Sequence, residues 1–257
     1  MKFLQSLSAQ VSLFTQGAIL ALGVVFILLD VITESLNPVI DLAWVTVLVC
    51  GLPLLINSVQ SIWERLEIHA NFLIVVAMVA LISIGDYHTA AYVGLIVQAG
   101  FFLEQLITGE SHYTVDDDML PTMPAQLVAM RQGINNYSSV IVVAVLLLSM
   151  GSFALTQDFK HTVTLLLVLC PCSLELILVA LMMGSLVDDA SPVSELSKGT
   201  KQSHLGLLIV SIVFHVAIIC VGVLGLIAPV TAVALHGLAR LGLVYNLKVL
   251  NGSLCVA

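Results

Sequence analysis

Charged residues are scarce in this chain. Asp, Glu, Lys and Arg make up 9% of the 257 residues, whereas hydrophobic residues make up 60%, and the mean hydropathy is +1.11. A soluble globular domain carries about 25% charged residues. The composition therefore excludes an ordinary soluble domain and predicts a polytopic membrane protein. The chain also lacks any basic patch, which excludes a nucleic-acid-binding surface.

Catalytic and disulfide motifs are also missing. Two polar segments, 107–135 and 188–204, are expected to be cytoplasmic loops, and neither contains a glycine-rich phosphate loop, a Ser-His-Asp set or paired carboxylates. Both are too short to be a folded domain of ordinary size. The cysteines show no pairing pattern and are expected to be free thiols. They are Cys50, Cys170, Cys172, Cys220 and Cys255.

What the chain does have is long apolar runs. Because about 20 apolar residues cross a bilayer as a helix, the sequence predicts an all-α bundle of eight transmembrane helices in a single transmembrane domain, 1–257. The spans are expected near 13–33, 39–56, 71–86, 88–107, 138–156, 162–187, 205–227 and 230–250. Lys160 would then lie on one side of the membrane, opposite most of the Lys and Arg residues. The positive-inside rule therefore predicts an integral multi-pass protein with both termini in the cytoplasm.

Two connections between the spans carry specific expectations. Gly51 and Pro53 are expected to break the second span, and the amphipathic segment 56–69 then predicts a short helix on the cytoplasmic surface. A simple amphipathic connector explains 56–69 equally well. A very tight turn is expected at 85–88, between the third and fourth spans.

The sixth span contains a Cys-Pro-Cys sequence, Cys170 to Cys172. Proline removes a backbone donor and should kink the helix there, so the two thiols would flank a polar pocket. His215 and His236 lie within the last two spans, and two thiolates with two imidazoles can form a tetrahedral site for zinc or a similar ion. Taken singly, each His is better explained by an interhelical hydrogen bond and each Cys by a small apolar filler. Only the four residues together, with the proline kink, make a metal site as good an explanation.

Five short motifs follow one another along the chain: Cys50 to Leu55, Ala77-Met78 through Ile84-Gly85-Asp86, Leu103-Glu104, Cys170 to Leu174, and His236 followed by Asn246. In this order they resemble the membrane part of the heavy-metal-transporting P-type ATPases. The resemblance implies transport-site thiols at Cys170 and Cys172 and a metal-binding or site-lining side chain at His236. His215 stands where relatives in the zinc branch have an intramembrane lysine. The resemblance also implies an inner ion entrance at Glu104 and an outer ion exit at Asp86.

The chain departs from this family in two respects. The phosphorylated Asp-Lys-Thr-Gly-Thr motif and the nucleotide-binding domain are absent from the 257 residues, so we expect no nucleotide binding and no ATP hydrolysis by this chain alone. Arg240 would repel a cation by about 4 kcal/mol per unit charge at 4 Å. We therefore expect Arg240 to pair with Glu175, on a span that runs in the same direction.

Three functions are consistent with these residues. The first is a membrane protein that binds or passively conducts a soft or borderline ion, Zn²⁺ or else Cu⁺, Cd²⁺ or Co²⁺. The second is the membrane subunit of a split ATP-driven exporter, partnered by a separate soluble ATPase or a metal-delivery protein. The third is a non-transporting membrane scaffold. The lipid bilayer is a partner in all three.

Overall fold

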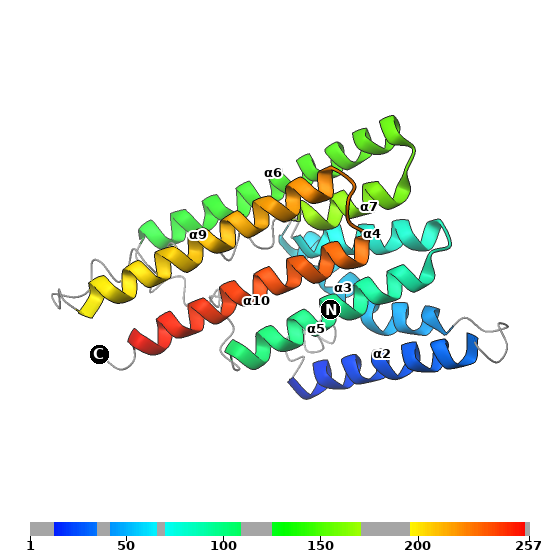
Figure 1. Ribbon diagram of the computed structural model, residues 1–257, viewed down its shortest axis with the longest axis horizontal. Coiled ribbons are helices and arrows are strands. Elements are labelled where there is room, and N and C mark those ends of the chain that lie inside the picture. The colour runs from blue at the N-terminus through cyan, green and yellow to red at the C-terminus, as the bar shows by residue number, and fades with distance from the viewer. Residues whose placement is uncertain (1–12, 35–41, 66–69, 109–124, 171–195, 255–257) are drawn as a thin grey trace.

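The computed structural model describes residues 13–34, 42–65, 70–108, 125–170 and 196–254. This part of the chain is all-α and contains eight helices, as expected (Figure 1). The helices are α2 (Leu13–Glu34), α3 (Ala43–Arg65), α4 (Ala70–Ser83), α5 (Tyr87–Thr108), α6 (Ala125–Thr156), α7 (Phe159–Val168), α9 (Leu196–Val223) and α10 (Pro229–Leu254).

Three of these helices are long and apolar enough to cross a membrane. The qualifying stretches are Phe14–Thr33 in α2, Ala43–Gln60 in α3 and Tyr137–Thr156 in α6. Large apolar side chains on these stretches are exposed, which suits contact with lipid rather than water. The chain is therefore an integral multi-pass membrane protein. Shorter apolar stretches occur in α4, α7, α9 and α10.

The expected break in the second span is wrong. Helix α3 continues through Gly51 and Pro53 to Arg65, so 56–65 extends the same helix instead of forming a separate one. A proline removes only one helical hydrogen bond, and neighbouring helices can support the backbone around it. The segments expected to be loops also contain helix, because α6 already begins at Ala125 and α9 at Leu196.

Two sets of helices meet at α4 and α10. Helices α2, α3 and α5 contact one another, and α7 contacts α6 and α9. Helix α4 contacts α3, α5, α6 and α7, while α10 packs most extensively on α5 and also contacts α7 and α9. In Figure 1, α10 runs between α9 and α5, in the same direction as α5. The junction of α4, α5, α7 and α10 is therefore the centre of the bundle.

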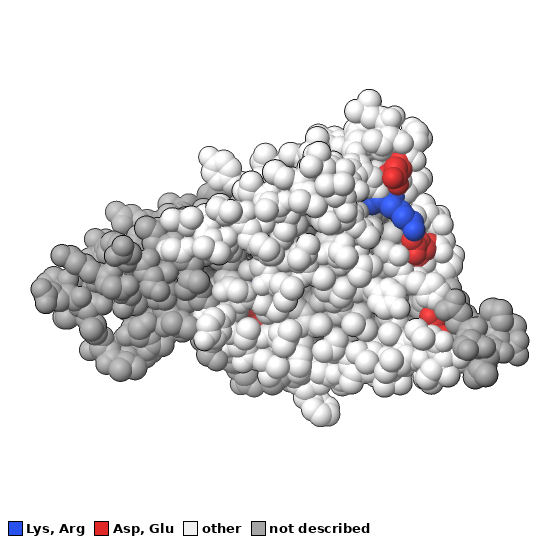
Figure 2. Space-filling model, viewed as in Figure 1, with Lys and Arg blue, Asp and Glu red and all other residues white. Residues whose placement is uncertain are grey.

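Several charged side chains of the described residues gather at one end of the bundle. Figure 2 shows a largely uncharged described surface with acidic and basic groups close together at that end. There, the carboxylate of Asp30 accepts a hydrogen bond from the Ala43 backbone N–H (3.2 Å) and lies 3.1 Å from His88 Nδ1. Asp30 is 4% exposed and ties together the ends of α2, α3 and α5. Asp30 and its partners therefore hold helix termini together at this end.

Candidate functional site

Helix α7 stops just before the Cys-Pro-Cys sequence. Its first turn is capped by Asp158, whose carboxylate accepts hydrogen bonds from the backbone N–H groups of Lys160 (2.9 Å) and His161 (3.3 Å). The helix ends at Val168, and Cys170 is non-helical and 4% exposed. A residue before proline is disfavoured in the helical conformation, so the position of Pro171 explains this end.

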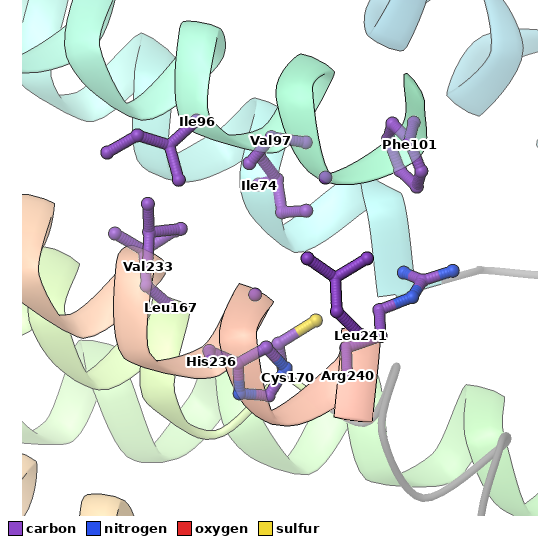
Figure 3. Close-up of a pocket in the computed structure, with 12 residues that line it drawn as sticks. Ile74, Ile96, Val97, Phe101, Leu167, Cys170, Val233, His236, Arg240 and Leu241 are labelled. Atoms are coloured by element: carbon purple, nitrogen blue, oxygen red, sulfur yellow. The ribbon is translucent and has the colours of Figure 1, made fainter. Parts of the chain in front are cut away.

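Cys170 and His236 line the same cavity. The cavity has a volume of about 50 Å³ and lies at the junction of α4, α5, α10 and the end of α7 (Figure 3). Its walls are mostly apolar, with Ile74, Val97 and Leu167 among them. One water needs roughly 10–15 Å³ of such volume, so the cavity is large enough for a metal ion beside Cys170 and His236.

The two histidines expected at the site are in contact. The rings of His215 on α9 and His236 on α10 have centroids 5.3 Å apart and meet edge to face at 83°. His215 Nδ1–H donates to the carbonyl oxygen of Ser211 over 2.9 Å. Because a carbonyl can only accept, this bond leaves the Nε2 lone pair as the acceptor of the neutral His215 ring. Both rings are buried.

Arg240 forms an ion pair with Glu104. One guanidinium nitrogen lies 2.9 Å from Glu104 Oε2 and donates to Glu104 Oε1 over 3.3 Å, and each side chain is 23% exposed. The guanidinium carbon also lies 5.2 Å from the ring centroid of Phe101, one turn before Glu104 on α5. The pair joins α5 to α10 beside the cavity. Glu175, the partner expected for Arg240, lies outside the described residues.

Asp86 lies in the turn between α4 and α5, at the charged end of the molecule. The expected tight turn is present, with Gly85 at φ 78°, and Asp86 accepts the Thr89 backbone N–H at 3.3 Å. Asp86 also pairs with Lys160 Nζ at 3.0 Å. Burial raises the pKa of Asp86, but hydrogen bonds from Thr89 and Lys160 and the charge of Lys160 outweigh it, so the net pKa is lowered. Asp86 therefore stays ionised near neutral pH.

The complete set of expected metal ligands cannot be followed in the structure. Cys172 lies outside the described residues. Among the residues that are described, no three His, Cys, Asp or Glu side chains lie close enough to hold a metal ion together. What the structure does bring together is Cys170 with His236 at the cavity, and His236 with His215.

Sequence reasoning missed the pairing of Glu104 with Arg240 and the contact of Arg240 with Phe101. It also missed the pairs Asp86–Lys160 and Asp30–His88. The sequence did contain a signal for the Glu104–Arg240 pair. The fourth and eighth predicted spans run in the same direction, and Glu104 lies near the end of the fourth. Comparison of the chain with family models, with curated proteins and with solved structures gives no match.

Proposed function

We propose that this chain is the membrane core of a protein related to the heavy-metal P-type ATPases. It binds or passively conducts a soft or borderline metal ion at Cys170, Cys172, His215 and His236, without hydrolysing ATP itself. The observation that carries the proposal is that Cys170 and His236, 66 positions apart in the sequence, line one central cavity, with the His215 ring against His236. Thiolate and imidazole are the ligands that zinc and copper favour.

The proposal includes eight membrane-spanning helices with both termini in the cytoplasm. Three helices have the length and apolar character to span alone, and four of the other five predicted spans contain the shorter apolar stretches of α4, α7, α9 and α10. The fifth is α5, a helix of 22 residues that packs against α2, α3, α4 and α10. Glu104 lies near the end of α5 and Asp86 precedes its start, so the two carboxylates are at opposite ends of one helix. This placement suits an inner entrance at Glu104 and an outer exit at Asp86.

Elemental analysis of the purified full-length protein tests the metal site. We expect a stoichiometric amount of zinc or copper in the wild type and its loss in both Cys170→Ser and Cys172→Ser. Cys220→Ser is the matched control, because Cys220 is an exposed cysteine on α9 and should not affect binding. A folded wild-type protein that takes up neither metal would contradict the proposal and favour a non-transporting scaffold.

A further inference from the structure

Arg240 places a fixed positive charge at the wall of the cavity. It follows His236 by four positions on α10, so the two side chains lie on the same face of that helix. Arg240 is part of the cavity wall, whereas its partner Glu104 is not. Figure 3 shows the Arg240 side chain extending along the cavity toward Phe101, so its charge lies at that end of the cavity, away from Cys170 and His236.

The guanidinium is held in this position from two sides. Glu104 contacts it through both carboxylate oxygens, and the Phe101 ring lies 5.2 Å from its central carbon. Both partners come from α5, the helix on which α10 packs most extensively. A positive charge held by an ion pair and an aromatic face cannot swing away from the cavity without losing both contacts.

We infer that Arg240 is a specificity-determining residue that disfavours divalent ions at the cavity more strongly than monovalent ions. The inference rests on the proposed function, because it concerns the ions that reach Cys170 and His236. Coulomb energy is proportional to the charge of the ion. A divalent ion at a given position is therefore repelled twice as strongly as a monovalent one, and Glu104, which does not line the cavity, offsets only part of the repulsion.

This proportionality gives a quantitative test with Ag⁺ and Cd²⁺, two soft ions that both favour thiol and imidazole ligands. Each ion is compared with itself in wild-type protein and in Arg240→Met, by equilibrium dialysis and elemental analysis, so its intrinsic ligand preference cancels. If the substitution tightens Ag⁺ binding about tenfold, it should tighten Cd²⁺ binding about a hundredfold, the square of the first factor. Glu104→Gln removes the carboxylate that neutralises the guanidinium. It should therefore weaken the binding of both ions, and that of Cd²⁺ more than that of Ag⁺.

Three further variants control for structural effects. Arg240→Lys keeps the charge and should keep the wild-type ratio of affinities. Glu104→Gln combined with Arg240→Met removes both charges together and leaves no unpaired charge, so this variant should fold. Its affinity for Cd²⁺ relative to Ag⁺ should still be higher than in the wild type. Lys160→Met removes a cation that is also paired with a carboxylate, Asp86, but that does not line the cavity. It should leave the ratio unchanged.

Two results would overturn the role of Arg240. One is an equal change in Ag⁺ and Cd²⁺ affinity in Arg240→Met, and the other is the same change in Lys160→Met. Either result would leave the proposed metal site standing. Conversely, failure of every variant and of the wild type to bind either ion would overturn the proposed function.

If no ion binds, a measurement without metal tests whether Arg240 places a positive charge at the cavity. The alkylation of Cys170 by iodoacetate, an anion, is compared with alkylation by neutral iodoacetamide, using mass spectrometry of the full-length protein. A positive charge at the cavity favours the anion, so the rate ratio should fall severalfold in Arg240→Met and stay constant in Lys160→Met. An unchanged ratio in Arg240→Met would contradict the inference.

Discussion

Asp86 shows how a single carboxylate can stabilise a helix junction. Its oxygens meet Lys160 at 3.0 Å and the N-terminus of α5 at Thr89, so one side chain fastens α7 to the turn between α4 and α5. The pKa of Asp86 is lowered below its ordinary value of 3.8 in the folded protein. Its stabilising contribution must therefore depend on pH.

The direction of this dependence follows from proton binding. In the unfolded chain Asp86 has its ordinary pKa, which is higher than its pKa in the folded protein. The unfolded chain therefore binds the proton more tightly, and acid favours unfolding. The contribution should be complete above about pH 4 and lost as the pH falls through the folded-state pKa. The midpoint of thermal unfolding in detergent, measured at pH 6 and at pH 3, should therefore fall less in Asp86→Asn than in the wild type. Identical falls in both proteins would contradict this assignment.

The partner of Arg240 illustrates what single residues in the sequence could and could not predict. A partly buried arginine calls for a carboxylate, and Arg240 has one in Glu104, whereas the expected pair with Glu175 stays a prediction. Glu175 and Glu104 both lie on predicted spans that run parallel to the last one, and only helix packing decides between such candidates. Because α10 packs on α5, Glu104 is the carboxylate that the described structure places there.

Glycines let neighbouring helices approach closely, and Gly222 on α9 is one such case. A Cβ at Gly222 would lie 2.9 Å from Val168 Cγ2 and 3.1 Å from Val168 Cγ1. Val168 is the last residue of α7 and is β-branched, so it has little freedom to turn away. Close approach at small residues is a common device for packing helices in membranes.

We expect Gly222→Ala to destabilise the protein by about 1–3 kcal/mol through overpacking. Gly151→Ala on α6 is the matched control, because nothing lies within 4 Å of its added Cβ. That change should stabilise the helix by up to about 1 kcal/mol. Thermal unfolding in detergent measures both. Combining Gly222→Ala with Val168→Ala should restore part of the loss, and a Gly222→Ala variant as stable as the control would refute the close contact.

The sequence predicts the ends of a helix correctly where the whole helix is apolar. For α2 and α5 the expected spans, 13–33 and 88–107, differ from the observed helices by one residue at most at each end. For α6 and α9 the helix starts earlier, because hydropathy detects the apolar part of a helix and not its polar extension. For α3 the effect of Pro53 was overestimated, since packing overrides local propensity.

At the scale of the whole molecule, the proposed eight spans place the termini on one side and the α6–α7 connection on the other. Gln157 lies in that connection and is exposed. A cysteine introduced at Gln157 should therefore react with a membrane-impermeant maleimide in intact cells. Epitope tags at both termini should become accessible only after permeabilisation. Labelling of a terminal tag in intact cells, or protection of the Gln157→Cys site, would contradict the proposed topology.

The central claim concerns the ligands around the metal, and X-ray absorption at the zinc edge of zinc-loaded full-length protein tests it most directly. We predict a mixed shell, with sulfur at about 2.3 Å and nitrogen at about 2.0–2.1 Å. The sulfur contribution should fall in Cys170→Ser and the nitrogen contribution in His236→Phe, while Cys220→Ser should retain both. A shell of oxygen and nitrogen alone, or a spectrum that neither Cys170→Ser nor His236→Phe alters, would contradict the account.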